Sequence, residues 1–186
     1  NHDGHGGKEL ERFALPALLK IPGGLIGEAL DPRSSQVLML DCEENDGSFS
    51  GQVLVELASL SVDSVSGIDR IFIISHRPIW AEEDPQYSPL FADNTRSTFG
   101  TNFQMDVYPL IEKIAQHAHV YWISGSMGGQ ARSSIFFQQH APNITFIQCA
   151  IRDVPRDALL IADVYPDTVK WSALSLTGQT LLAPEA

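Results

Sequence analysis

Residues 70–75 read RIFIIS and residues 119–124 read HVYWIS, and these two apolar runs decide the fold class. Each run is continuous and rich in β-branched and aromatic side chains, which is typical of a strand that is covered on both faces. Between them, residues 106–117 carry apolar side chains at helical spacing. A strand, a helix and a second strand in this order predict a layered α/β domain.

On the N-terminal side of this unit the alternation of helices and strands continues, and on the C-terminal side it ends. Towards the N-terminus we expect two helices, 9–20 and 52–60, and one strand, 36–42. Towards the C-terminus we expect three consecutive strands with no helix between them, 144–149, 158–165 and 168–176. The sheet of the α/β domain is therefore expected to be completed by antiparallel strands, arranged as a β-meander.

A long segment with three prolines and little apolar periodicity, residues 77–102, follows the first strand of the central unit. Irregular segments of this length are uncommon in compact domains unless they have a function. Its aromatic residues Trp80, Tyr87 and Phe91 either line a substrate cleft or pin the segment to the body of the domain. The sequence does not choose between these two interpretations.

The chain has 186 residues, with 23 Asp and Glu against 12 Lys and Arg, and a formal net charge of −11. This length predicts one domain. Nucleic acid is not expected as a partner, because non-specific binding to it requires a net basic face. No apolar run reaches the roughly 18 residues that a membrane-spanning helix needs. Cys42 and Cys149 are too few for a disulfide framework, and we expect both to be buried free thiols.

Three short polar motifs lie where chemistry is expected in such a domain. They are Asn1-His2-Asp3, residues 75–78 (SHRP) and residues 124–129 (SGSMGG). The second and third each follow one of the two central strands. Because ligands of open α/β sheets gather beyond the carboxyl ends of the strands, these two loops are candidates for a common site.

The order of these motifs resembles the C-terminal part of the calcineurin-like metallophosphoesterases. Asn1-His2-Asp3 resembles the N-H-D motif of that family, and His76 in IISHRPIW resembles its lone metal-binding histidine after a strand. Residues 123–129 lie where the family has its G-H-x-H turn. The resemblance implies one metallophosphoesterase-like domain over 1–186, a layered α/β/β/α sandwich that is incomplete at its N-terminus.

The resemblance also implies a chemistry, metal-dependent phosphoester hydrolysis. In that family two metal ions hold a hydroxide and clamp both oxygens of an in-line displacement at phosphorus. Carried over to this chain, Asn1 and His76 bind a metal ion, which is iron, manganese or zinc. His2 assists departure of the alcohol, and Asp3 orients His2. The implied substrate is a small phosphoester or a phosphoprotein.

Arg77 stands next to His76 and is a candidate for binding the substrate phosphate. The alternative is that Arg77 pairs with one of the many carboxylates of this acidic chain.

The chain also departs from the family pattern. The D-x-H and G-D-x-x-D motifs are absent from it, and Ser126 and Gly128 stand where two ligand histidines are expected. Asn1 and His76 alone are too few ligands for a tight site. The alternative function is therefore a catalytically degenerate domain without metal, a pseudoenzyme that binds or assembles with a protein partner or with a separate N-terminal chain.

Other residues that carry chemistry are expected to have ordinary roles. His117 and His119 lie before a strand, at the end opposite the candidate site, which disfavours a metal role for them. His140 is expected in an exposed polar loop. Ser126 is not expected to be a hydrolase nucleophile, because no Asp lies between it and His140, the last histidine of the chain.

Overall fold

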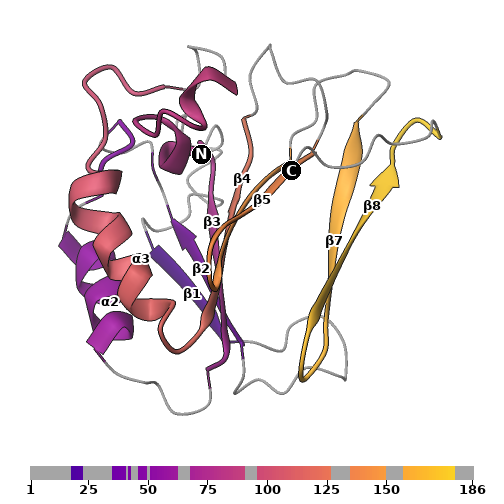
Figure 1. Ribbon diagram of the computed structural model, residues 1–186, viewed down its shortest axis with the longest axis horizontal. Coiled ribbons are helices and arrows are strands. Elements are labelled where there is room, and N and C mark those ends of the chain that lie inside the picture. Colours follow the sequence, from indigo (N-terminus) through magenta and orange to yellow (C-terminus); the bar gives the residue numbers. More distant parts are fainter. Residues whose placement is uncertain are drawn as a thin grey trace, which may run out of the picture.

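One six-stranded sheet forms the centre of the protein, as the computed structural model shows (Figure 1). The structure describes residues 18–22, 35–40, 42, 46–49, 51–62, 68–90, 96–126, 135–149 and 157–178. The strands of the sheet are β1 (Leu18–Pro22), β2 (Ser35–Leu40), β3 (Arg70–Ser75), β4 (His119–Ser124), β5 (Ile135–Ala141) and β6 (Ile144–Cys149). Their spatial order is β1-β2-β3-β4-β6-β5.

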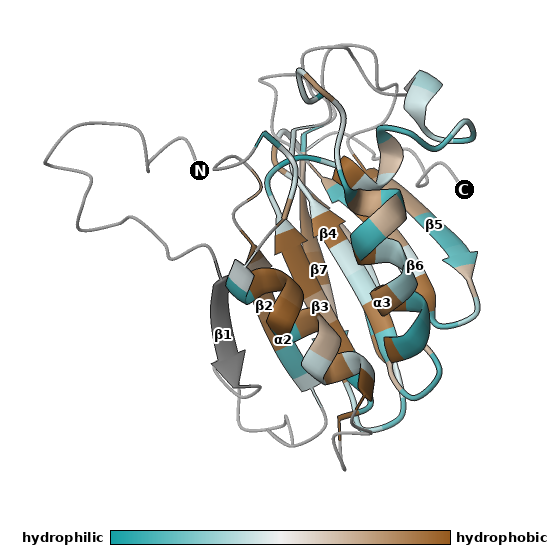
Figure 2. Ribbon diagram, turned by 90° about the vertical axis from the view of Figure 1, so that its left-hand side faces the viewer, coloured by the Kyte–Doolittle hydropathy of each residue, from teal (hydrophilic) through white to brown (hydrophobic). Residues whose placement is uncertain are grey.

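Four adjacent strands of this sheet, β2, β3, β4 and β6, are parallel. The outer strands β1 and β5 are antiparallel to their neighbours. The expected α/β class is therefore confirmed. Figure 2 shows β2 and β3 as hydrophobic along most of their length, which agrees with strands covered on both faces.

Helices cover one face of the sheet (Figure 1). They are α2 (Gly51–Val62), a π-helical turn (Phe103–Val107) and α3 (Tyr108–Ile114), which follows that turn directly. Val53, Leu57 and Leu60 of α2 are buried one helical turn apart, so one face of the helix enters the core. The helix expected over 106–117 is thus divided into the π-helical turn and α3. Pro109 lies in the first turn of α3, where its missing N–H costs nothing.

A two-stranded antiparallel hairpin covers the opposite face of the sheet (Figure 1). It consists of β7 (Ala158–Val164) and β8 (Val169–Ser175). Its inner side chains, including Trp171, pack against Phe72, Tyr121 and Ile147 of the main sheet. The described residues therefore form three layers, which are helices, the main sheet and the hairpin.

Three expectations about the strands were wrong. Residues 18–20 were expected in a helix and lie in β1, which pairs with β2. Residues 135–141 form β5, a strand that the sequence interpretation did not include. The C-terminal strands do not form a meander, because β6 lies parallel to β4 while β7 and β8 form a separate sheet.

The segment 77–102 is held to the body of the domain by its aromatic side chains. Trp80 and Tyr87 are buried, and the Trp80 ring stacks on Phe146 with 4.7 Å between centroids. Tyr87 packs edge-on against Trp80 and Phe136. Of the two interpretations left open, pinning is confirmed for Trp80 and Tyr87, whereas Phe91 lies outside the described residues.

Within the described ranges, no helix has both the length and the apolar character that crossing a membrane requires.

Candidate functional site

The carboxyl ends of the parallel strands meet at one edge of the sheet. Ser75, the last residue of β3, is in register with Ser124, the last residue of β4. The Gly125 amide donates a hydrogen bond to the Ser75 carbonyl over 3.4 Å. A Cβ placed on Gly125 would lie 3.4 Å from the carbonyl oxygen of His76 and 3.9 Å from Cδ2 of the His76 ring. The structure therefore brings His76 beside the Gly125 loop, as the sequence predicts.

Two buried serines connect these strand ends beneath His76. Ser75 Oγ donates to the Arg77 carbonyl over 3.0 Å and accepts from Trp122 Nε1 over 2.9 Å. Ser124 Oγ lies 3.1 Å from Ser75 Oγ and accepts from Trp80 Nε1 over 3.1 Å. Because a hydroxyl has one proton, Ser124 must be the donor to Ser75. The donor and the acceptor of each hydrogen bond in this network are then defined. The network holds the backbone next to His76 in place.

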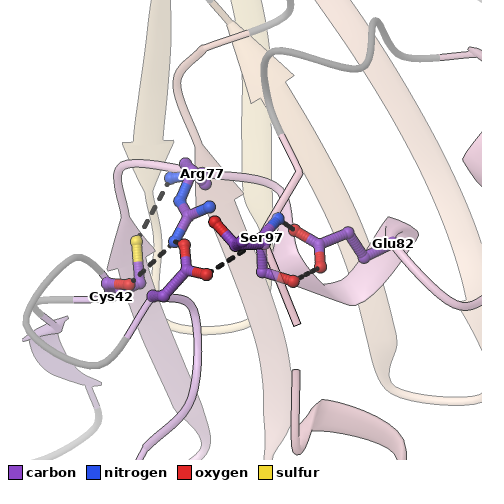
Figure 3. A network of polar contacts seen from close by, with 6 residues as sticks. Cys42, Arg77, Glu82 and Ser97 are labelled. Atoms are coloured by element: carbon purple, nitrogen blue, oxygen red, sulfur yellow. Dashed lines mark hydrogen bonds and ion pairs between the residues drawn. The ribbon is translucent and has the colours of Figure 1, made fainter. Parts of the chain in front are cut away.

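The side chain of Arg77 extends towards Cys42 and Asp46 (Figure 3). Its side chain is 7% exposed, and Nη2 lies 3.3 Å from Asp46 Oδ1 and 3.3 Å from the Cys42 carbonyl. Its backbone amide donates to Cys42 Sγ over 3.4 Å. The carboxylate partner expected as the alternative is therefore present. Contact between Arg77 and a substrate phosphate stays a prediction.

The acidic groups near Arg77 bind backbone amides of residues 96–102. Asp46 Oδ2 accepts from the Thr98 amide over 2.5 Å. This hydrogen bond, and to a smaller extent the Arg77 charge, holds the pKa of Asp46 below its ordinary value. The Glu82 carboxylate accepts from both the amide and the hydroxyl of Ser97 (Figure 3). These carboxylates fasten the loop rather than point into a common ligand site.

The metal chemistry that the resemblance implies is met only in part by the described residues. His76 supplies one imidazole at the strand ends, while Asn1, His2 and Asp3 lie outside the described residues, as does Gly128. Ser126 is described and has a positive φ of 52°. Within the described ranges, no group of three His, Cys, Asp or Glu side chains is placed to hold a metal ion. The described residues therefore do not form a metal centre by themselves.

His140 is not in an exposed loop, so that expectation was wrong. It lies half-buried in β5, and its Nδ1 is 2.8 Å from the Tyr87 hydroxyl while its Nε2 is 3.0 Å from the Tyr108 hydroxyl. Burial lowers the pKa of His140 and raises that of Tyr87 to about 12. This Tyr–His–Tyr bridge ties β5 to α3 and to the segment that Tyr87 pins.

Both cysteines are free thiols. Cys42 is buried, as expected, but Cys149 is only half-buried and donates from Sγ to the Ala158 carbonyl over 3.3 Å. His117 and His119 lie at the opposite edge of the sheet, as expected. His117 Nε2 is 3.1 Å from the Leu60 carbonyl, and His119 Nε2 is 2.9 Å from Thr145 Oγ1.

Comparison with known proteins adds no family to this description. No protein-family model, no curated protein and no solved structure matches the chain. The function is therefore argued from the fold and from the geometry around His76.

Proposed function

We propose that the chain is a calcineurin-like phosphoesterase domain that hydrolyses phosphoesters with the help of bound metal ions. The observation that carries this proposal is the position of His76. It follows the central parallel strand β3 and lies beside the loop after β4, at the sheet edge where ligands of α/β proteins bind. The layers of helices, sheet and hairpin support the α/β/β/α sandwich that belongs to this proposal.

In this proposal His76 and Asn1 hold an iron, manganese or zinc ion. His2, oriented by Asp3, assists departure of the alcohol. Neutral imidazole suits iron and zinc, and the amide carbonyl of Asn1 suits manganese. The serines beneath His76 keep its backbone in place, so that the ring is presented at the strand ends. The substrate is a small phosphoester or a phosphoprotein.

A second candidate function is a degenerate domain that binds a protein partner. Two observations favour it. The described residues hold no group of three metal-ligating side chains, and the cation nearest to His76 in the sequence, Arg77, is already paired with Asp46. Both observations concern the edge where a phosphoesterase would do its chemistry.

The experiment that separates the two functions is elemental analysis of the purified protein after reconstitution with iron, manganese and zinc in turn. We expect about one or two metal ions per chain, which His76→Ala loses together with activity on phosphomonoesters and phosphodiesters. The matched control is His117→Gln at the opposite edge, which should keep both. A folded wild-type protein that retains none of the three metals overturns the hydrolase proposal and favours the degenerate domain.

A further inference from the structure

A polar cavity lies at the amino ends of β3 and β4, the edge of the sheet opposite His76. Its volume is about 430 Å³. One wall is the main sheet, and another is the turn between β7 and β8, residues 165–168. Figure 1 shows this turn at the lower end of the hairpin, below the edge at which the parallel strands begin. His76 and Arg77, the described residues of the proposed hydrolase site, do not line it.

Arg70 is the cationic residue of this cavity, and its side chain is only partly satisfied. The residue is 6% exposed. Its Nη2 donates to the Pro166 carbonyl over 2.7 Å, whereas Nη1 is buried and has no hydrogen-bond partner among the described residues. Asp69 and Asp167 also line the cavity, but in the described residues neither forms an ion pair with Arg70. Arginine stays protonated in proteins, so within the described part of the chain this nearly buried positive charge has no ion-pair partner.

Polar and aromatic side chains line the cavity around Arg70. His119, in register with Arg70 on β4, is half-buried and stacks on Tyr121 with 4.1 Å between ring centroids. Thr168 lines the cavity from the hairpin turn. A guanidinium fork binds carboxylate and phosphate oxygens with two parallel hydrogen bonds. We propose that this cavity binds a small oxyanion, a carboxylate or phosphate group, through Arg70.

The charges facing the cavity decide how tightly such an anion is held. Arg70 attracts it, while the exposed carboxylates of Asp69, before β3, and Asp167, in the hairpin turn, repel it. The remaining titratable groups are His117, after α3, and His119 and Tyr121 on β4. Affinity is therefore modest, and it increases when Asp167 loses its charge.

His119 is a built-in reporter of this binding. Burial lowers its pKa, and the positive charge of Arg70 lowers it further. An anion seated on Arg70 offsets that charge, so the pKa of His119 should rise when the cavity is filled. His140 lies in β5, in contact with Tyr87 and Tyr108, and serves as an internal control.

The test is an NMR titration of the imidazole signals of the intact protein, with inorganic phosphate and, separately, acetate. Sodium chloride holds the ionic strength constant. We expect the His119 signals to move in a saturable way and the His119 pKa to rise, while the His140 signals stay fixed. Arg70→Gln should weaken binding by at least about tenfold. Arg96→Gln, which removes an exposed arginine, should leave it unchanged.

Two further variants keep the test decisive if Arg70→Gln does not fold. Arg70→Lys keeps the charge but loses the fork, so it should bind more weakly than wild type. Asp167→Asn should bind more tightly. If Asp167→Asn instead weakens binding and lowers stability, Asp167 is the internal partner of Arg70 and the proposal fails. It also fails if neither anion moves the His119 signals. Since no metal is involved, these outcomes are independent of the hydrolase test.

Discussion

Two arginines of this protein are buried to nearly the same degree and yet differ in what surrounds them. Arg77, at the carboxyl edge of the sheet, is 5% exposed, and Arg70, at the amino edge, is 6% exposed. Arg77 has a carboxylate and a carbonyl as partners for Nη2. Arg70 has one carbonyl, and a cavity lies beside it. Burial alone therefore does not separate a structural arginine from a ligand-binding one, whereas the set of partners does.

The carboxyl edge depends on the ring of Trp80 more than on any single polar contact. The fully buried ring stacks on Phe146, and its Nε1 donates to Ser124 Oγ. Trp80→Ala should lower the free energy of unfolding by about 3–5 kcal/mol, because it leaves a cavity in the core. The control Trp80→Phe keeps the stacking and loses one hydrogen bond, so it should cost about 1–3 kcal/mol. Urea denaturation measures both, and a Trp80→Ala loss below about 1 kcal/mol would contradict this view.

Replacing each arginine by methionine tests the comparison directly. Arg77→Met should cost about 1–3 kcal/mol of unfolding free energy, because it removes charge-assisted hydrogen bonds that join two loops. Arg70→Met should cost less or stabilise, because it removes a buried charge that has no ion-pair partner in the described ranges. Chemical denaturation in a buffer without phosphate or carboxylates measures the difference in unfolding free energy. An Arg70→Met protein that is less stable than the Arg77→Met protein would reverse the interpretation of the two sites.

A double-mutant cycle of Arg77→Met and Asp46→Asn measures how much of the unfolding free energy lost at Arg77 comes from its ion pair with Asp46. Since the Asp46 side chain is 42% exposed, solvent screens the pair and the coupling should be small. A larger coupling would show that the pair, and not the carbonyl of Cys42, holds the guanidinium.

Stability should fall as the pH drops below about 6.5, the ordinary pKa of histidine. Burial lowers the pKa of both His140 and His119 in the folded protein. The unfolded chain therefore takes up protons first, so stability is full above the ordinary pKa and is lost as the pH falls towards the lowered one. Urea denaturation at pH 7.5 and pH 5.5 measures this loss.

A pair of variants assigns that pH dependence. His140→Gln should reduce it, because one of the two buried imidazoles is removed. His119→Gln should reduce it as well, because it removes the other imidazole whose pKa burial lowers. Equal pH dependence in wild type and His140→Gln would contradict the lowered pKa of His140.

The strands that the sequence predicts best are the ones buried on both faces. RIFIIS and HVYWIS form β3 and β4 with the expected ends, because continuous β-branched and aromatic runs fit few other structures. The edge strands were missed. Residues 18–20 end the helix that was expected over 9–20 and instead belong to β1, which pairs with β2, and β5 is obscured by the polar run at 138–140. Long-range pairing, which a single sequence does not display, decides both.

The candidate site, like the fold, could be predicted from the sequence only in part. Order along the chain predicts that His76 and the Gly125 loop meet, because both follow strands of one parallel sheet. It does not predict which acid Arg77 pairs with, because Asp46 reaches it from a loop 31 residues away. Nor does it predict Arg70 as a ligand-binding residue. The RIFIIS pattern marks Arg70 only as the start of a strand, and the cavity beside it depends on the distant turn at 165–168.

The last strand of the main sheet also has a consequence for solubility. β5 stands at the end of the strand order, where a sheet offers its backbone to neighbouring molecules. Its second half is Gln138-Gln139-His140, and its register with β6 shifts between Gln139 and Ala141. The break in the ladder discourages another strand from joining this edge. It lies at the end of the polar run that hides β5 from sequence interpretation, and it limits edge-to-edge aggregation.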